Sequence, residues 1–315
     1  EGDYDKVLEN YQKVLGIHLK KQPMGNLDAA KAYRKIAKLH YDKGEYDLAL
    51  EYNRKAMVIR RKQRAPQSPR QHHLDLADSY RSYGLTLLRK DKLRESRDYL
   101  EKALDIYLNK RRTKMAEANV LSDIGRCHYM EGEYDKALEE CMKALAIREE
   151  EKGQDHIVVA DSLNDIGKVY CAQCDYVKAL YNHQTARKIR IAKAGEKNRV
   201  VARSHSNIGK VYNLTGKHEK ALEQFELALK MDLERLGGDP GQEHFLVARS
   251  YNEIGEVHLS MYQYDQALKS FRDALGIRLN TFGEDHSDVA ESYSNIGKVL
   301  CAQGEYNKAL ENFQK

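Results

Sequence analysis

Basic side chains recur at intervals of about 42 residues along this chain of 315 residues, each directly after a glycine or alanine. They are Lys38, Arg126, Lys168, Lys210 and Lys298. Arginines and asparagines recur shortly before the same small residue, at Arg34, Arg81, Asn164, Arg203, Asn207, Arg249, Asn252 and Asn295. Lys and Arg supply charge-assisted donors to carboxylates, and Asn can hydrogen-bond the backbone amides of an extended peptide. These residue types predict a surface that binds an acidic linear peptide.

The alternative explanation is that these lysines are solvated and were copied by internal duplication. The position directly after the small residue is basic in five of seven repeats, and the exceptions are Leu85 and Glu256. This recurrence favours a binding role over chance.

Motifs for other chemistry are weak. The sequence has no Walker loop, no GxSxG and no HExxH. Cys171-x-x-Cys174 resembles half a zinc knuckle, but no second CxxC accompanies it, so a structural role is preferred. His72-His73 and the Asp-His pairs at 155–156 and 285–286 lack a third metal ligand nearby. We predict no catalysis, no metal site and no cofactor.

Internal repetition supplies the elements that must position the basic residues. The small residue is Ala37 in one repeat and glycine in six others, at Gly84, Gly125, Gly167, Gly209, Gly255 and Gly297. Each repeat has two halves with apolar residues at spacings of three and four, which predicts two amphipathic helices. The gap between them is short and predicts an antiparallel pair. We attribute the small residue to close backbone approach within each pair.

The pattern therefore predicts one all-α array of helix pairs. Its expected parts are a lone second helix at 1–20, then repeats at 27–62, 74–110, 115–150, 157–193, 199–234, 245–280 and 287–315, the last unfinished. Because the array starts and stops in the same phase, we expect a fragment of a longer array. Ends without a polar cap are expected to associate head to tail between molecules.

Several residues in each repeat carry a resemblance to a known family. In the fifth repeat these are Leu163, Gly167 and Tyr170 on the first helix, and Ala179 and Ala186 on the second. With long linkers such as "FGEDHSDVA" at 282–290, the chain resembles tetratricopeptide repeats of the kinesin light chain and nephrocystin-3 type. The resemblance implies a right-handed α-solenoid whose first helices line a concave, peptide-binding groove. The alternative to such a scaffold is a regulatory, ligand-sensing array of a larger protein with a nucleotide-binding switch.

Composition and charge limit the remaining classes. No run of about 18 apolar residues is present, so a membrane span is not expected. The five cysteines form no regular framework, which predicts free thiols in a reducing cytoplasm. Residues 1–115 hold 27 Lys and Arg against 16 Asp and Glu, but no aromatic residue interleaves with the two basic runs at 60–70 and 109–117. Nucleic acid is therefore a poor candidate partner.

Overall fold

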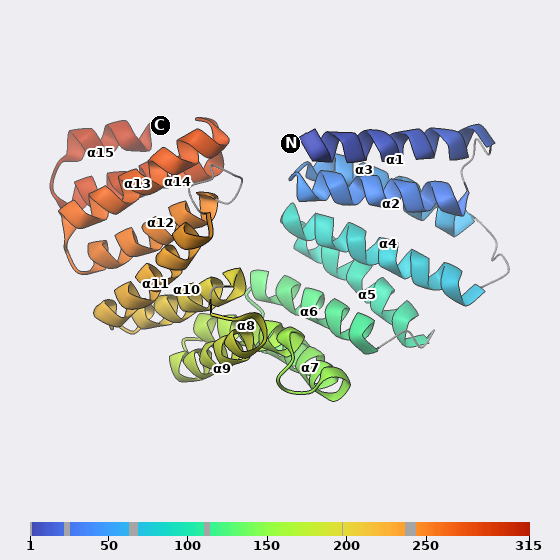
Figure 1. The fold of residues 1–315 in the computed structure, drawn as a ribbon, viewed down its shortest axis with the longest axis horizontal. Helices are drawn as coiled ribbons and strands as arrows, with labels where there is room; N and C mark the ends of the chain where they lie inside the picture. Colours follow the sequence, from blue (N-terminus) through green and yellow to red (C-terminus); the bar gives the residue numbers. More distant parts are fainter. Residues whose placement is uncertain (1, 22–25, 63–68, 110–113, 197, 237–243) are drawn as a thin grey trace. The chain divides into compact units, whose positions relative to one another are not determined.

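The computed structural model describes residues 2–21, 26–62, 69–109, 114–196, 198–236 and 244–315. Regular structure in these residues is entirely helical, which confirms the all-α prediction (Figure 1). The helices are α1 (Gly2–Lys21), α2 (Leu27–Asp42), α3 (Tyr46–Lys62), α4 (Pro69–Arg89), α5 (Leu93–Asn109), α6 (Lys114–Met130), α7 (Tyr134–Lys152), α8 (Ile157–Ala172), α9 (Tyr176–Ala194), α10 (Arg199–Leu214), α11 (His218–Leu236), α12 (His244–Ser260), α13 (Tyr264–Phe282), α14 (Ser287–Ala302) and α15 (Tyr306–Phe313).

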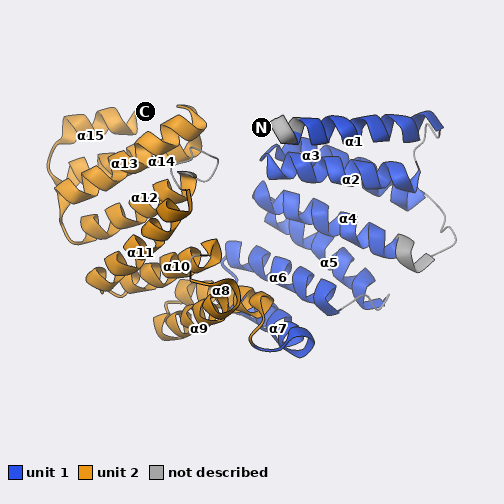
Figure 2. Ribbon diagram, in the orientation of Figure 1, with its two compact units in different colours: residues 1–154 blue, residues 155–315 orange. Residues whose placement is uncertain are grey.

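Contacts between helices divide the chain into two compact units, 1–154 with α1–α7 and 155–315 with α8–α15 (Figure 2). Each first helix packs against the second helix that follows it, in the pairs α2–α3, α4–α5, α6–α7, α8–α9, α10–α11, α12–α13 and α14–α15. Successive first helices also touch, as α2 with α4, α4 with α6 and α10 with α12. The sequence predicts one array of repeats, and the contacts between helices group these repeats into the two units. A division at a linker is possible because each repeat contacts mainly its neighbours.

The helix limits differ little from the predicted repeat limits. The largest difference is the start of α4, at Pro69 rather than at residue 74. Proline suits the first turn of a helix, because the amide hydrogen that it lacks would have no partner there. Much of the linker between α3 and α4, and the linker between α11 and α12, lies outside the described residues.

A tight turn joins the two helices of each repeat and requires a left-handed residue. Glycine supplies it in four repeats, for example Gly132 with φ of 77°. In the other three, Asp91, Cys174 and Tyr262 adopt φ of 58° to 60°. A residue with a Cβ is strained in this conformation by about 1 kcal/mol. These three turns are therefore less favourable than the glycine turns.

The glycine inside each first helix makes room for a side chain rather than mainly for backbone. A Cβ added at Gly209 would lie 2.8 Å from the ring of Phe225, and one at Gly167 would lie 2.7 Å from the ring of His183. The contacted residue comes sixteen positions later in every repeat, at Leu100, Cys141, His183, Phe225, Phe271 and Phe313. Backbone carbonyls also lie close at two glycines, 3.1 Å from a Cβ added at Gly84 and 3.2 Å from one added at Gly125. The glycines therefore make room for a side chain in these six repeats, and two of them also allow the predicted close approach of the backbones.

Buried arginines connect each of several second helices to the next first helix. Arg190 of α9 is fully buried and donates to Ser204 Oγ at 2.8 Å and to Asp161 at 2.7 Å. Arg278 of α13 donates to Ser292 at 2.7 Å, and Arg60 of α3 donates to Ser79. Because a buried guanidinium without partners would be costly, these hydrogen bonds fix the spacing of adjacent repeats.

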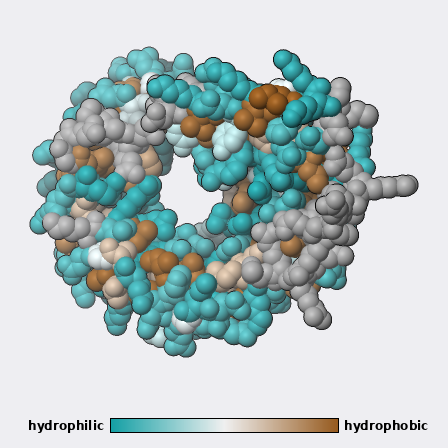
Figure 3. Space-filling model, turned by 45° about the vertical axis from the view of Figure 1, so that its right-hand side comes forward, coloured by the Kyte–Doolittle hydropathy of each residue, from teal (hydrophilic) through white to brown (hydrophobic). Residues whose placement is uncertain are grey.

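The face drawn in Figure 3 is predominantly hydrophilic, with hydrophobic residues in scattered patches. Among the described residues, none of the helices combines the length and apolar character needed to cross a bilayer.

Candidate peptide-binding surface

Four of the predicted binding residues lie on the first helices of unit 1. Arg34 and Lys38 come from α2, Arg81 from α4 and Arg126 from α6. A hollow of about 510 Å³ lies between α2 and α4. Its lining is Arg34, Lys35, Lys38, Tyr41, Asp42, Asp78, Arg81, Ser82 and Leu85. Four cations against two carboxylates make it electropositive.

The cations of unit 1 are only partly neutralised. Arg34 approaches Asp78 at 3.4 Å, and Arg81 Nε donates to Asp123 at 2.7 Å. Burial raises the pKa of Asp123, and Arg81 and Arg126 oppose that change. Lys38 and Arg126 are exposed and form no ion pair with a described residue. These two side chains can therefore meet an acidic ligand without first breaking a salt bridge.

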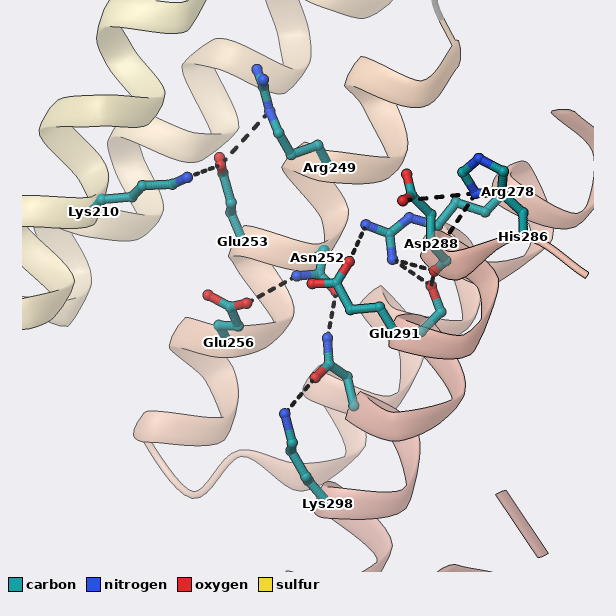
Figure 4. Close-up of polar contacts among 12 residues, drawn as sticks. Lys210, Arg249, Asn252, Glu253, Glu256, Arg278, His286, Asp288, Glu291 and Lys298 are labelled. Atoms are coloured by element: carbon teal, nitrogen blue, oxygen red, sulfur yellow. Dashed lines mark hydrogen bonds and ion pairs between the residues drawn. The ribbon is translucent and has the colours of Figure 1, made fainter. Parts of the chain in front are cut away.

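The asparagines of unit 2 pair with one another between repeats. Asn207 Nδ2 donates to Asn164 Oδ1 at 2.5 Å, joining α10 to α8. Asn295 Nδ2 donates to Asn252 Oδ1 at 2.8 Å, joining α14 to α12 (Figure 4). In both pairs the asparagine three residues before the glycine meets the one two residues before the next glycine. One hydrogen bond therefore joins the two side-chain amides of each pair.

The lysines of unit 2 have nearby acceptors. Lys168 Nζ lies 2.9 Å from Asp165, and Lys210 Nζ lies 3.0 Å from Glu253, which is almost fully buried. Lys298 Nζ donates to Asn295 Oδ1 at 3.0 Å. The lysine positions thus carry less uncompensated charge than the sequence pattern indicates.

The two predicted arginines of unit 2 are held more loosely. Arg203 Nη2 lies 3.7 Å from Asp161 Oδ1, and Arg249 Nε lies 3.8 Å from Glu253 Oε1 (Figure 4). Both distances exceed a hydrogen bond. These guanidinium groups keep free donor capacity.

Sequence reasoning missed the acids that balance these cations. Asp123, Asp165 and Glu253 all stand two residues before the helix glycine, the position that Asn207 and Asn295 occupy in other repeats. A comparison of that one position across the repeats would have found them. The net charge around each of these lysines and arginines therefore depends on an acidic residue of its own repeat or of the next repeat.

Two histidine patterns that suggest metal ligands have structural explanations. His156 and His286 accept hydrogen bonds from the backbone amides of Val158 and Asp288, so they cap α8 and α14. His128, Glu131 and Glu133 lie within 4.8 Å of one another. Arg97 Nη1 donates to Glu131 at 2.5 Å and lies 3.2 Å from His128 Nδ1. A cation already occupies this cluster, which disfavours a metal ion there.

The Cys171-x-x-Cys174 pair lies at the turn after α8. Cys174 takes the left-handed turn position, where most repeats have glycine, and burial raises the pKa of Cys171. A raised pKa opposes thiolate formation. A structural role therefore explains the pair better than redox chemistry.

Comparisons with known proteins were made for the whole chain. No curated protein matches it. The Rap conjugation gene regulator of the plasmid pLS20, solved in complex with the Phr* peptide, is similar at 16% identity and a TM-score of 0.65, with 91% of this chain and 73% of that chain covered. The STAND protein PH0952 from Pyrococcus horikoshii, which has a tetratricopeptide repeat sensor, is similar at 18% identity and a TM-score of 0.64, covering 96% of this chain and 43% of that chain.

Kinesin light chain-like repeats give a further match. The TPR-like repeats of a Podosopora anserina putative kinesin light chain are 15% identical, with a TM-score of 0.53 over 65% of this chain and 95% of that chain. The profile of the tetratricopeptide repeat family matches residues 28–109, 116–192, 159–234 and 246–315. Since these ranges take in most of the sequence, the chain belongs to the tetratricopeptide repeat family.

Proposed function

We propose that this chain is a protein–protein interaction scaffold that binds an extended acidic peptide along the first helices of unit 1. The observation that carries the proposal is the electropositive hollow between α2 and α4, with the exposed cations Lys38 and Arg126 on the same series of first helices. Helix pairs hold these helices rigid, so little entropy is lost when a peptide binds.

The first helices of unit 2 are less suited to an acidic ligand. Three of their four paired asparagines are buried, and the cations beside them have acceptors nearby. We propose that selectivity for acidic residues resides in the first helices of unit 1.

The similar fold of the Rap regulator, solved with a bound peptide, supports peptide binding as the general function. Exposed ion pairs contribute about 1 kcal/mol or less each, so we expect moderate affinity that weakens as salt increases. In this proposal the protein acts in the cytoplasm, where its five free thiols would stay reduced.

The test is a peptide-library selection followed by fluorescence anisotropy with the enriched acidic peptide. The Lys38→Glu/Arg126→Glu variant should bind it roughly tenfold more weakly, because two attractive charges become repulsive. The matched variant Lys168→Glu/Lys298→Glu changes two lysines of unit 2 and should lose much less. Lys188→Glu/Lys230→Glu, on the second helices α9 and α11, reverses the same number of charges and is the control for net charge. Equal losses in all three variants would contradict a localised basic site for acidic peptides.

The alternative function is a ligand-sensing array within a larger regulatory protein. The similar fold of the sensor-bearing PH0952, of which this chain covers 43%, favours it. The sequence on either side of these residues in the complete gene distinguishes the two: an adjacent nucleotide-binding ATPase module would support the sensor. A coiled coil in that place would support an adaptor.

We also propose weak head-to-tail association. The described part of α15 exposes Tyr306, Leu310 and Phe313, and α1 exposes Val14 and Ile17. Burying such residues between molecules is favourable. Sedimentation velocity over a concentration series should show reversible dimers, and a strict monomer at high concentration would refute this.

A further inference from the structure

The second helix α9 differs from the other second helices at two outward positions. Its second and sixth residues are Val177 and Tyr181, which are 83% and 69% exposed. In α3, α5, α7, α11, α13 and α15 the same two positions hold only charged or amide side chains, namely Asp47 and Glu51, Arg94 and Asp98, Asp135 and Glu139, Glu219 and Glu223, Asp265 and Lys269, and Asn307 and Glu311. Two adjacent apolar side chains that replace charged ones in this way mark α9 as a candidate contact surface.

The charge of α9 also differs from that of these six helices, because it alone among them has no acidic residue. Its cations are Lys178, Arg187, Lys188, Arg190 and Lys193. Other segments compensate three of the five. Arg190 donates to Asp161 at 2.7 Å, and Lys178 lies 2.8 Å from Asp175. Arg187 donates to Gln224 at 3.2 Å, beside Glu223 in the sequence of α11.

The remaining two cations, Lys188 and Lys193, are exposed and form no ion pair with a described residue. Glu196 follows the helix and lies three residues from Lys193. No acidic residue stands between Asp175 and Glu196, so Lys188 has no carboxylate near it along the helix. Lys188 is therefore the cation of α9 that keeps its charge for a partner.

The apolar pair and Lys188 lie on the same face of α9. Lys188 comes seven residues after Tyr181 and eleven after Val177, and offsets of four, seven and eleven residues return to one side of an α-helix. At 1.5 Å per residue, Lys188 lies about 10 Å along the axis from Tyr181. The face thus presents an apolar ridge followed by an unpaired cation.

We propose that this face of α9 docks an amphipathic helix of another protein, with two apolar side chains against Val177 and Tyr181 and a carboxylate that reaches Lys188. Apolar residues four apart form a ridge that packs into the groove of a second helix. An Asp or Glu seven residues from the apolar pair of the partner helix matches the distance to Lys188.

Charge favours another protein over a second copy of α9 as the occupant. Because α9 has no acidic residue, two copies placed face to face would offer Lys188 no carboxylate. The surface belongs to a second helix and shares no residue with the peptide site proposed on the first helices of unit 1. The two sites can therefore succeed or fail separately.

The test is a selection from a displayed library of 20-residue amphipathic helices with varied apolar and charged positions. We expect the enriched helices to share two apolar residues and an acidic residue seven positions away. Fluorescence anisotropy with one enriched peptide then measures binding to the natural chain and its variants. Val177→Glu/Tyr181→Glu gives α9 the residues that α11 has at these positions, and it should weaken binding at least tenfold.

Charge reversal supplies a result that a folding defect cannot imitate. Lys188→Glu should weaken binding roughly tenfold, and a peptide whose acidic residue is replaced by lysine should recover most of that loss. Leu233→Glu, at an exposed apolar position of α11, is the control and should leave binding unchanged. Lys38→Glu/Arg126→Glu should also leave it unchanged, although it weakens the acidic peptide of unit 1.

Several outcomes would overturn the proposal. These are no enriched helix, no effect of Lys188→Glu, or an equal loss in Leu233→Glu. Sedimentation velocity tests the second copy, since self-association that Val177→Glu/Tyr181→Glu abolishes would assign the face to a dimer instead. Binding to phosphatidylserine vesicles that the same variant abolishes would assign it to a membrane surface.

Discussion

The two units fill the same notch beside the helix glycine or alanine with different side chains. In unit 1 the position sixteen residues later is Asn53, Leu100 or Cys141, whereas in unit 2 it is an aromatic ring in all four repeats. Their charges differ too, with 32 Lys and Arg against 26 Asp and Glu in unit 1, and 21 against 22 in unit 2. Unit 2 is therefore built on large apolar contacts and a balanced polar surface. Unit 1 combines smaller contacts with unpaired cations.

The largest test of this difference removes the contacted side chain in each unit. Phe225 is buried against Gly209, so Phe225→Ala should lower the free energy of unfolding by about 3–4 kcal/mol through lost burial and a cavity. Asn53 is fully buried, and its amide makes no hydrogen bond with a described residue. Asn53→Ala should therefore change stability by less than about 1 kcal/mol, since a desolvated polar group is removed.

Urea unfolding followed by circular dichroism measures both changes. Asn53→Leu serves as the companion variant, and it should not be more stable than the natural chain, because Ala37 carries a Cβ where Gly84 leaves room for Leu100 in the next repeat. If Asn53→Ala lowers the free energy of unfolding as much as Phe225→Ala does, the two units depend equally on the side chain in this notch.

Of the four rings that contact a helix glycine in unit 2, one is an imidazole, that of His183, and the others are phenylalanine rings. Burial lowers the pKa of His183 to about 4, so the folded chain holds a neutral imidazole against Gly167. The unfolded chain takes up this proton near pH 6.5, and the folded chain does so only near pH 4. Stability should therefore fall as the pH drops between these values, by at most about 3 kcal/mol. His183→Phe should abolish this part of the acid sensitivity.

The measurement is the urea midpoint of the natural chain and of His183→Phe from pH 7 to pH 4. Phe225→His, which places an imidazole in the equivalent notch, should add a similar sensitivity to acid. If His183→Phe and the natural chain lose stability in parallel, the buried imidazole is not the cause.

The smallest expected effect lies in the turns. Tyr262 in unit 2 occupies a left-handed position with φ of 58° that Gly132 occupies in unit 1. Tyr262→Gly should raise the free energy of unfolding by about 1 kcal/mol, and Gly132→Ala should lower it by a similar amount. Thermal melts of both variants check this, and no change in either would show that the turns tolerate a Cβ without strain.

The helices and their pairing follow from sequence periodicity, because apolar spacing, short turns and the recurring glycine all indicate the same helix pair. Two features could not be predicted in this way. The partner of each glycine lies sixteen residues away on another helix, so only packing reveals that Gly167 accommodates the His183 ring. The division into two units also depends on contacts between helices rather than on any local pattern.

The helix on which each proposed binding residue lies could be predicted from the sequence, but its ion pairs and hydrogen bonds could not. The sequence places Lys38 and Lys210 in equivalent slots, yet Lys38 is unpaired among described residues while Lys210 meets the buried Glu253 of the next repeat. Such a difference depends on a residue 43 positions away. Likewise, Asn252 and Asn295 become a pair only when α12 and α14 lie side by side.

The buried arginines have a mechanical consequence. Each one joins a second helix to the following first helix through hydrogen bonds, so it holds consecutive repeats together. The α5–α6 and α11–α12 junctions lack that connection, because Tyr107 and Asp232 take the place of the arginine. When the chain is stretched from its ends, we expect the first rupture at one of these two junctions, and the repeats on either side of it to unfold as independent segments.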